Sequence, residues 1–400
     1  MKVLLFGDSP MAINEGGICQ TLFNLFSYIE PDNFLGVTSF EKKDFYKIGD
    51  RYSGRYFNYK NIWLHTPRNR IGKFLSPFFE WINFSICQLC TYNALKKEIN
   101  HFNPDIIISC SCSSIGILMH HKLFNKSQFK EKVVPYFMDD WMYKSSKVWL
   151  NGNLQDLIKK MLCTNDSWMM IGKELSEILS DRYGCKPKKV LYIRNPVDLP
   201  NEVIKVTYSR KNKFKIAYAG ALWPMHYDAF LLFVKAVYKI SKEKDVIIYL
   251  YTPQSFWDFR KKELTALNVI YGGHIPYTNL NEKLLEADAL LITSSFDTLY
   301  YTHSKASLQT KITDYSKANR LIISCGPEYS ANHNFLKEND CGICIETQNI
   351  DEICKYVNDV IDNVITYQYK VENAFESLKD FTKDIVHKKI QKFLVETSKH

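Results

Sequence analysis

The sequence predicts an α/β protein built from two doubly wound domains, each a parallel sheet covered by helices. Short apolar runs recur along the chain and alternate with amphipathic helical stretches, which is the pattern of buried parallel strands and crossover helices. The length of 400 residues is enough to bury two domains' worth of core. A polar stretch near the middle separates the runs into two series.

The expected strands are short runs rich in Val, Ile, Leu, Tyr and Phe. In the first series they are Lys2–Phe6, Leu35–Ser39, Tyr56–Tyr59, Ile106–Ser109, Val133–Phe137, Trp168–Ile171 and Val190–Tyr192. In the second series they are Lys215–Ala219, Val246–Tyr251, Val269–Tyr271, Ala289–Thr293, Leu321–Ser324 and Gly342–Ile345.

The expected helices connect these strands and carry an apolar stripe at helical spacing. They are Gly17–Ile29, Phe79–Asn100, Gly116–Leu123, Leu154–Met161, Lys173–Tyr183, Tyr227–Ser241, Leu280–Ala287, Lys311–Lys317 and Ile350–Ile361. A final helical stretch, Phe375–Val395, either completes the second domain or crosses back to the first.

The boundary between the domains is expected in Leu199–Lys213, which is polar, contains Pro200 and lacks apolar periodicity. We therefore expect an N-terminal domain over residues 1–205 and a C-terminal domain over 206–400. Open parallel sheets bind ligands outside the carboxyl ends of their strands, so two such sheets are expected to face each other across a ligand-binding cleft.

Composition excludes several classes of protein. The apolar fraction of 46% and the 16 glycines argue against a disordered or collagen-like chain. The first apolar run is too short for a signal peptide, and no apolar stretch is long enough to span a bilayer, so a cytoplasmic location is expected. A net charge of +9 without a clustered basic stripe does not indicate nucleic acid.

The eleven cysteines are expected to be reduced and mostly buried, because the chain carries no secretion signal. Two pairs, Cys87 with Cys90 and Cys341 with Cys344, have the spacing of metal ligands. Neither has further Cys or His residues at zinc-site spacing, so core packing is the favoured interpretation and no metal site is expected.

The first loop contains Glu15, Gly16 and Gly17 where the first helix begins. Adjacent glycines let a ligand approach bare backbone, and free N–H groups at a helix start favour anions. A ligand-free Gly-Gly turn is an equally good interpretation.

Asp139 and Asp140 follow a buried strand at its carboxyl end. Neighbouring carboxylates repel, which indicates proton chemistry or contact with sugar hydroxyls. The alternative is that either one caps the following helix. A second acid, Asp198, closes the turn Arg194-Asn-Pro-Val-Asp, whose alternative interpretation is a simple turn leading out of the first domain.

Lys311 and Asp314 lie three residues apart at the start of a predicted helix, so they share one face. There Lys311 would meet a diphosphate and Asp314 would accept hydrogen bonds from ribose hydroxyls. An ordinary salt bridge between the two on a solvated surface is the alternative.

With these motifs the chain resembles the GT-B glycosyltransferases, and within them the group-4 enzymes of bacterial polysaccharide and glycolipid synthesis. The likeness covers nearly the whole chain. It rests on the Gly16-Gly17 loop, the Arg194–Asp198 turn, the strand ending at Gly220, the run Val269–Pro276 and the Thr310–Tyr315 helix. It implies two Rossmann-like domains and a nucleotide-sugar donor.

The resemblance also implies roles for individual residues. The donor would be bound by Gly16, Gly17, Gly220, His226, Gly273, His274, Ile275, Ser304, Thr310, Lys311 and Asp314. Glu15 and Asp139 would contact the acceptor, and Asp139, Asp140 and Lys311 would be the catalytic groups.

The chain departs from the family at three places. Ala306 stands where these enzymes often carry a first acid, eight residues before Asp314. Ala221–His226 replaces the usual Arg and Lys pair, with His226 and Lys311 as the candidate substitutes. Met138 stands where a His often precedes the acid.

The reaction implied is transfer of a sugar from a nucleoside-diphosphate sugar to a saccharide or a lipid-linked acceptor in surface polysaccharide synthesis, with retention of configuration. No metal or other cofactor is expected, since Asp139-Asp140 is not a DxD signature. The other interpretations are a nucleotide-sugar epimerase of the same architecture and a catalytically silent scaffold protein.

Residues 67–84 place Arg68, Arg70 and Lys73 beside Phe74, Phe78, Phe79, Trp81 and Phe84. Cations next to aromatic residues suit a headgroup interface, which predicts peripheral contact with the anionic inner membrane and access to a lipid-linked acceptor. Core packing of a long helix is the alternative.

Overall fold

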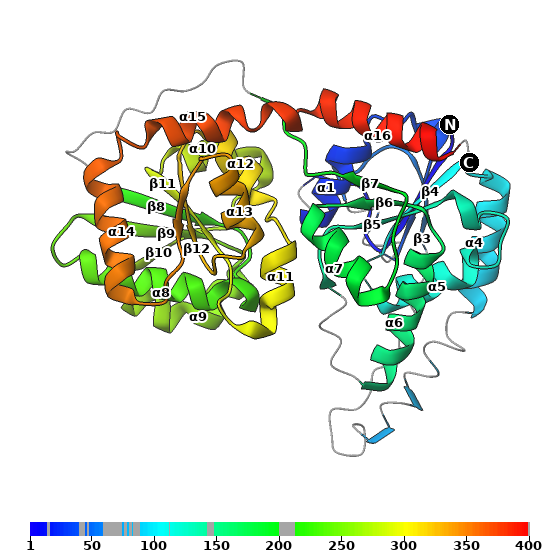
Figure 1. Cartoon of the computed structure of the whole chain (residues 1–400), viewed down its shortest axis with the longest axis horizontal. Coiled ribbons are helices and arrows are strands. Elements are labelled where there is room, and N and C mark those ends of the chain that lie inside the picture. The colour runs from blue at the N-terminus through cyan, green and yellow to red at the C-terminus, as the bar shows by residue number, and fades with distance from the viewer. Residues whose placement is uncertain are drawn as a thin grey trace. The chain divides into compact units, whose positions relative to one another are not determined.

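A computed structural model of the chain shows two compact units, which are described separately (Figure 1). The first comprises Met1–Ile193 and Val386–His400, and the second comprises Arg194–Ile385. The structure describes residues 1–13, 17–39, 45, 48–58, 74–75, 78–79, 82, 89–111, 113–141, 148–199 and 213–398.

The first unit contains a seven-stranded sheet in the order β3-β2-β1-β4-β5-β6-β7, and every paired neighbour is parallel. Its strands are β1 (Val3–Gly7), β2 (Phe34–Thr38), β3 (Arg55–Asn58), β4 (Ile106–Cys110), β5 (Val133–Phe137), β6 (Ser167–Met170) and β7 (Lys189–Tyr192). Its helices are α1 (Gly17–Phe26), α4 (Leu89–Phe102), α5 (Ser114–Phe124), α6 (Val148–Cys163) and α7 (Lys173–Tyr183), with short 3-10 turns at Pro31–Asn33 and Lys130–Lys132.

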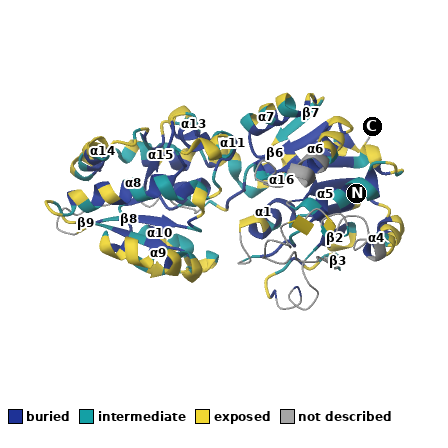
Figure 2. Ribbon diagram, turned by 90° about the horizontal axis from the view of Figure 1, so that it is seen from below, coloured by how far each residue is buried: buried dark blue, intermediate teal, exposed yellow. Residues whose placement is uncertain are grey.

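Two apolar layers, one on each face of this sheet, form the core of the first unit. Val3 and Leu5 of β1 belong to one layer, while Leu4 and Phe6 belong to the other. This division follows from the two-residue period of a strand, whose successive side chains point to opposite faces. Both faces are therefore covered by helices, and Figure 2 shows the buried strands lying beneath partly exposed helices.

The last helix, α16 (Lys383–Thr397), contributes to the core of the first unit. Val386, Ile390 and Leu394 are buried against residues of β1 and α1, and His387 contacts the backbone carbonyl of Asn24 through its Nε2 atom. The apolar side chains recur every four residues, as expected for one helical face. The C-terminal end of the chain therefore completes the N-terminal unit.

The second unit contains a six-stranded parallel sheet in the order β10-β9-β8-β11-β12-β13. Its strands are β8 (Phe214–Ala219), β9 (Val246–Tyr251), β10 (Val269–Gly273), β11 (Ala289–Thr293), β12 (Leu321–Cys325) and β13 (Ile343–Ile345). Its helices are α8 (Pro224–Ile240), α9 (Gln254–Ala266), α10 (Tyr277–Leu285), α11 (Tyr301–Ala306), α12 (Lys311–Lys317), α13 (Ala331–Glu338), α14 (Ile350–Asn363) and α15 (Gln368–Glu376), with 3-10 turns at Thr298–Tyr300 and Lys379–Phe381.

All thirteen expected strands are confirmed, each to within two residues at either end. The expected helices are confirmed where the structure describes them, but α9, α11, α13 and α15 were not predicted. Helix α9 buries only Trp257 and Leu264, and α11 has six residues, so neither produces an extended apolar stripe. The final stretch Phe375–Val395 is divided between α15, a 3-10 turn and α16.

The expectation that all cysteines are reduced is wrong for one pair. Cys163, at the end of α6, and Cys185, in the turn after α7, form a disulfide bond across a Cα separation of 5.0 Å. Sequence reasoning could not pair them, because helix packing brings together positions that are 22 residues apart. Cys341 and Cys344 are not bonded to each other, and Cys87 and Cys112 lie outside the described residues.

Each sheet has one point where the strand order reverses direction. This point lies between β1 and β4 in the first unit and between β8 and β11 in the second. In sheets of this kind ligands bind beyond the carboxyl ends of the strands at the reversal. The loops that follow these four strands are therefore the expected ligand-binding edges of the two sheets. In the described part of the chain, no helix combines the length and apolar character required to cross a bilayer.

Candidate functional site

The carboxyl end of β11 carries a buried polar group that joins several elements of the second unit. The backbone carbonyl of Thr293, the last residue of β11, accepts from His226 Nδ1 at 3.0 Å and from Gln309 Nε2 at 2.7 Å. The Thr293 hydroxyl donates to the carbonyl of His226 at 3.0 Å. A carbonyl oxygen can only accept, so Nδ1 of His226 must carry a proton. These bonds fix helix α8 and the segment before α12 to the reversal point.

The ammonium of Lys311 is buried at this same reversal point. Its Nζ lies 3.9 Å from the centroid of the Tyr218 ring, in β8. A Cβ atom placed on Gly220 would lie 3.4 Å from it. Nζ has no hydrogen-bond partner among the described residues, so the alternative of a surface salt bridge with Asp314 is not observed. Burial lowers the pKa of Lys311 to about 7.

Helix α12 is held against the sheet by a tyrosine next to the predicted acid. The hydroxyl of Tyr315, whose side chain is buried, accepts from the backbone N–H of Ala219 at 2.8 Å. Ala219 is the last residue of β8, and Gly220 follows it with a φ of +128°, a conformation that favours glycine. The absence of a side chain at Gly220 leaves backbone exposed beside the Lys311 ammonium.

Asp314 lies one turn after Lys311 and contacts Tyr277, the first residue of α10. The Tyr277 hydroxyl donates to Asp314 Oδ1 at 3.1 Å. Burial raises the pKa of Asp314 to about 6, and the Tyr277 bond opposes that rise. Gly273, at the end of β10, has a φ of +85° and open space where a side chain would stand. The predicted base-binding loop and the predicted ribose acid are thus neighbours.

The other residues expected to bind the donor have different environments. Ser304 is buried in α11 and donates to the carbonyl of Ser295 at 3.2 Å. Thr310 is exposed directly before α12, and its carbonyl accepts from the Thr313 hydroxyl. His274 is exposed, and Ile275 is partly buried against the core. Gly220 and Lys311 lie side by side, while His226 and Ser304 bond to the backbone carbonyls of Thr293 and Ser295.

In the first unit, Asp140 forms a two-pronged ion pair. Its two carboxylate oxygens accept from the Arg182 guanidinium at 2.8 and 2.6 Å, and the Asp140 side chain is fully buried. The pair raises the pKa of Arg182, so the cation is retained. This arrangement holds the loop after β5 to α7. The catalytic role expected of Asp140 stays a prediction. Asp139 is half-buried, and its Oδ1 accepts from the Trp141 N–H at 3.2 Å.

Sequence reasoning missed Asp8, which directly follows β1 at the reversal point of the first sheet. Asp8 Oδ1 accepts from the hydroxyl of Ser113, the residue that caps α5, at 2.8 Å. The Asp8 carbonyl accepts from the hydroxyls of Thr38 and Ser39 after β2. Ser111, after β4, is buried close to Gly116 in the first turn of α5. The sequence feature that could have identified Asp8 is its position directly after the first apolar run.

The remaining predicted site residues are those of the first loop and of the Arg194–Asp198 turn. Glu15 and Gly16 lie outside the described residues, and Gly17 is the exposed first residue of α1. Within the second unit, Arg194 lies over the rings of Phe335 and Phe381, and Asp198 pairs with Lys383. The Arg194–Asp198 turn is therefore anchored by packing on the segment before α16.

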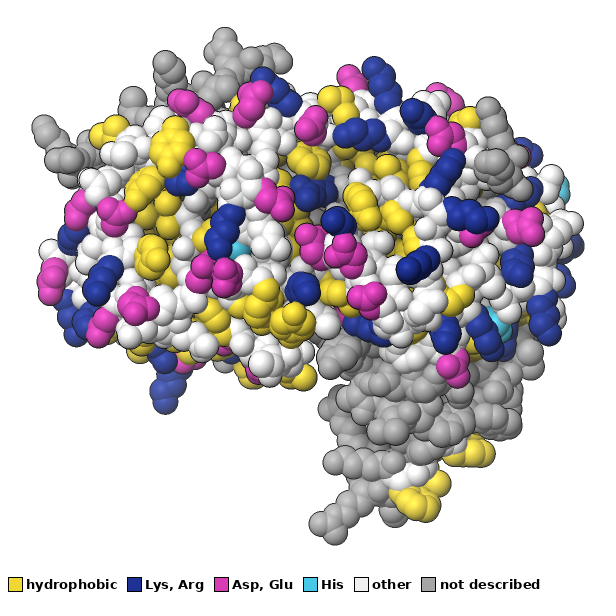
Figure 3. Space-filling model, in the orientation of Figure 1, with side chains coloured by type: hydrophobic (Ala, Val, Ile, Leu, Met, Phe, Trp, Pro, Cys, Tyr) yellow, Lys and Arg dark blue, Asp and Glu magenta, His cyan; other side chains and the backbone are white. Residues whose placement is uncertain are grey.

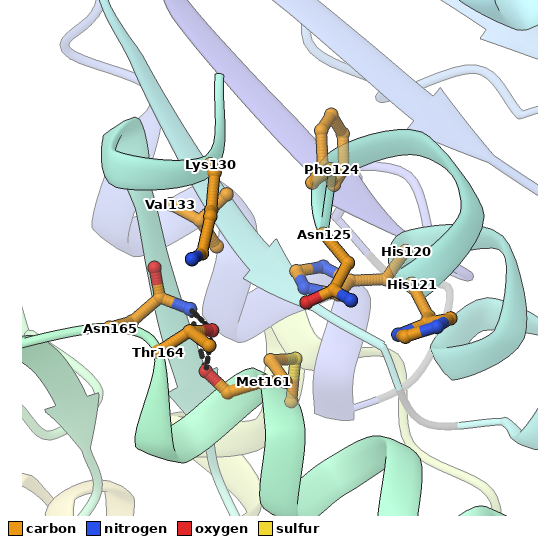
Figure 4. A pocket seen from close by; sticks show the side chains of 9 residues that line it. All are labelled: His120, His121, Phe124, Asn125, Lys130, Val133, Met161, Thr164 and Asn165. Atoms are coloured by element: carbon orange, nitrogen blue, oxygen red, sulfur yellow. Dashed lines mark hydrogen bonds between the residues drawn. The ribbon is translucent and has the colours of Figure 1, made fainter. Parts of the chain in front are cut away.

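Two cavities in the first unit lie away from these loops. The smaller, of about 10 Å³, lies among α5, β5 and α6 and is lined by His120, His121, Phe124, Asn125, Lys130, Val133, Met161, Thr164 and Asn165 (Figure 4). Its volume suits one water molecule. Burial lowers the pKa of His120 to about 3, so its ring, 2.8 Å from the Ser109 hydroxyl, is neutral. The larger, of about 450 Å³, opens at the amino ends of β1, β2 and β3, opposite the predicted ligand edge.

On the face drawn in Figure 3, acidic and basic side chains are interspersed, and neither sign of charge forms a separate patch. Among the described residues, no three His, Cys, Asp or Glu side chains gather in a way that could hold a metal ion.

Comparison with solved structures identifies the architecture. Alr3699/HepE from Anabaena, solved in complex with UDP, matches with a TM-score of 0.69 at 12% identity over 99% of this chain and 100% of that one. A glycosyltransferase from Rickettsia africae matches with a TM-score of 0.65 at 14% identity over 100% and 99%. Sucrose-phosphate synthase from Thermosynechococcus elongatus matches with a TM-score of 0.68 at 11% identity over 99% of each chain.

These similarities extend over the full length of both partners, so the chain has the two-domain GT-B fold that its motifs resemble. No protein-family model matches the sequence. No curated protein matches it either. At such identities the likeness shows the fold, and the chemistry must be argued from the residues of this chain.

The ion pair of Asp140 predicts that the two neighbouring acids differ in their effect on stability. Asp140→Asn should lower the free energy of unfolding by about 2–4 kcal/mol, because it leaves the Arg182 cation partly buried without a counter-charge. Asp139→Asn should change it by less than about 1 kcal/mol. Urea unfolding followed by circular dichroism measures both, and equal small effects would show that the ion pair is not formed.

Proposed function

We propose that the protein is a glycosyltransferase that takes a sugar from a nucleoside-diphosphate sugar. The observation that carries the proposal is the buried Lys311 side-chain nitrogen at the reversal point of the second sheet, which contacts the Tyr218 ring and has no hydrogen-bond partner among the described residues. A buried cation without an anion is costly, and a diphosphate in contact with Lys311 would supply the missing partner. The GT-B fold and the UDP and UDP-glucose bound in the Anabaena structures support this ligand class.

Lys311 has the position and charge to assist the chemical step. When the bond between the anomeric carbon and the β-phosphate oxygen breaks, negative charge develops on the departing diphosphate. A fixed ammonium in a site with little water stabilises that charge strongly. The missing side chain at Gly220 lets a phosphate approach the backbone next to Nζ.

The rest of the nucleotide is proposed to lie along α12 and the loop after β10. The Asp314 carboxylate accepts hydrogen bonds from ribose hydroxyls, while Tyr277 holds its other side. Above a pH of about 6 this carboxylate is ionised, so it is an acceptor at neutral pH. The open backbone at Gly273 leaves room for the base.

The acceptor is proposed to lie at the carboxyl edge of the first sheet, where Asp8 and Asp139 follow β1 and β5. In the transfer, a bond from an acceptor hydroxyl oxygen to the anomeric carbon replaces the bond to the β-phosphate oxygen, and the hydroxyl proton passes to the departing diphosphate. Carboxylates and the nearby serine hydroxyls suit recognition of a saccharide. A saccharide or lipid-linked acceptor, a role in surface polysaccharide synthesis, and retention of configuration complete the proposal, on the strength of the resemblance to group-4 enzymes.

A lipid-linked acceptor is supported by exposed apolar side chains in the first unit. Phe74, Leu75 and Phe78 are 84%, 39% and 57% exposed, so core packing does not account for them. Arg68, Arg70, Lys73, Trp81 and Phe84 lie outside the described residues, and Phe79 is half-buried. Exposed aromatic residues in a basic stretch of sequence favour peripheral contact with anionic lipid.

Replacing Lys311 tests the diphosphate contact. Lys311→Met should weaken binding of the preferred nucleoside diphosphate roughly ten- to hundredfold, because a charge-assisted hydrogen bond is lost. The ligand-free variant should unfold at the same temperature or higher, since a buried unpaired charge is removed. Isothermal titration with UDP, GDP and ADP measures the affinity. The matched control is Lys283→Ala, whose ammonium pairs with Glu286 on α10.

The outcomes separate the proposed enzyme from its rivals. Unchanged affinity in Lys311→Met would remove Lys311 from the site. No binding of any of the three nucleotides to the wild type would favour the silent scaffold. An epimerase would need both an acid and a base in the site. The Asp140 carboxylate is paired with the Arg182 guanidinium, which argues against its use as either group.

The membrane contact has its own test. Wild-type protein should sediment with phosphatidylglycerol-rich vesicles, and the double variant Phe74→Ser/Phe78→Ser should lose most of that binding. Phe259→Ser is the matched control, because Phe259 is equally exposed, at 82%, on the second unit. Equal sedimentation of all three proteins, or none by the wild type, would contradict the contact.

A further inference from the structure

The segment that joins α11 to α12 contains three buried polar atoms that have no hydrogen-bond partner. They are Ser307 Oγ, Gln309 Oε1 and Lys311 Nζ, and the statement holds for the whole described part of the chain. Buried polar groups in folded proteins are nearly always paired, because an unpaired one forfeits its hydration without compensation. Three such atoms at alternate positions in five residues indicate a ligand that supplies the partners.

The orientation of the Gln309 amide is fixed by its surroundings. Its nitrogen donates to the carbonyl of Thr293 at 2.7 Å, and because that carbonyl can only accept, the amide cannot be turned around. The Gln309 backbone N–H donates to Asn332 Oδ1 at 3.1 Å, and Asn332 in turn donates to the Ser294 hydroxyl at 2.9 Å. Gln309 is therefore held at both ends, and its Oε1 is a preorganised acceptor.

Gln309 lies beside the residues to which the nucleotide is assigned. It shares the Thr293 carbonyl with His226, so its amide nitrogen and the His226 ring both contact one oxygen atom. It precedes Lys311 by two residues, and its own carbonyl accepts from the Ile312 N–H at the start of α12. A diphosphate at Lys311 would bring its attached sugar into this neighbourhood.

We propose that Gln309 is a specificity-determining residue whose Oε1 accepts a hydrogen bond from a hydroxyl of the transferred sugar. This inference rests on the proposed function and extends it to the donor's sugar. The first acid of the related enzymes is absent here, since Ala306 is small, apolar and buried. The acceptor in this segment is the neutral amide of Gln309, which selects donors that present a hydroxyl, hexoses among them.

The assignment predicts different effects for the two neighbours Gln309 and Lys311. Gln309→Met removes the acceptor at nearly constant volume and should weaken UDP-glucose binding about tenfold while changing UDP binding less than twofold. Lys311→Met should weaken both ligands by a similar factor, because it contacts the diphosphate that they share. Isothermal titration measures the ratio of variant to wild-type affinity for each of the two variants and each of the two ligands. If the wild type prefers guanine or adenine, GDP-mannose with GDP, or ADP-glucose with ADP, replaces the uridine pair.

Deoxyfluoro analogues of the sugar identify the hydroxyl. A fluorine cannot donate, so one of the 2-, 3-, 4- or 6-deoxyfluoro analogues should bind the wild type about tenfold more weakly than the parent sugar nucleotide. The same analogue and its parent should bind Gln309→Met equally well. Changing the ligand and the residue together isolates this one contact. If Gln309→Met acted only by disturbing the structure, the analogue would still bind the variant more weakly than its parent does.

The results distinguish failure of this inference from failure of the proposed function. If no nucleotide binds the wild type, both are overturned. If the nucleotide binds but Gln309→Met affects UDP and UDP-glucose equally, or no analogue loses affinity, only the role of Gln309 is overturned. Gln309→Asn, which retains the amide but withdraws it by one methylene, should give the same pattern as Gln309→Met if the latter does not fold.

Discussion

The organisation of the second unit depends on the cost of keeping the Lys311 ammonium out of water. Packing against Tyr218 and the backbone near Gly220 removes its hydration, and no described side chain compensates with a hydrogen bond. The fold can sustain this cost because Tyr315 and the Thr293 carbonyl hold the surrounding elements firmly. An anion that paired with this group would recover part of that cost.

The two sheets place their polar residues according to the same rule. In each unit the strand order reverses once, and the loops after the flanking strands carry the buried polar clusters. In the first unit this cluster is centred on Asp8 and the cap of α5, and in the second it is centred on Thr293 and Lys311. The interiors of both sheets are apolar on both faces, so the chemistry is confined to the loops.

The sequence was sufficient to predict the strands and part of the site, for a clear physical reason. A parallel strand buried on both faces must be a short apolar run, and such runs are visible without a partner. The resemblance to GT-B enzymes assigned Lys311 and Gly220 to one donor site, and the structure brings these two residues side by side. Partners distant in sequence were not predictable, as with Arg182 for Asp140 and Cys185 for Cys163. The orientation of the Gln309 amide was not predictable either, because it is fixed by a backbone carbonyl, and every residue type has one.

The proposed diphosphate contact depends on the charge state of Lys311, and the pKa of this side chain can be measured directly. Nuclear magnetic resonance of the lysine side chains, with the Lys311 signal assigned by its loss in Lys311→Met, gives the pKa of this group with and without UDP or whichever diphosphate binds. We predict a pKa of about 7 for Lys311 in the ligand-free protein and a pKa at least one unit higher in the complex, because a neighbouring anion favours the charged form. An ordinary pKa near 10.5 in the ligand-free protein, or a pKa that bound nucleotide leaves unmoved, would contradict this prediction.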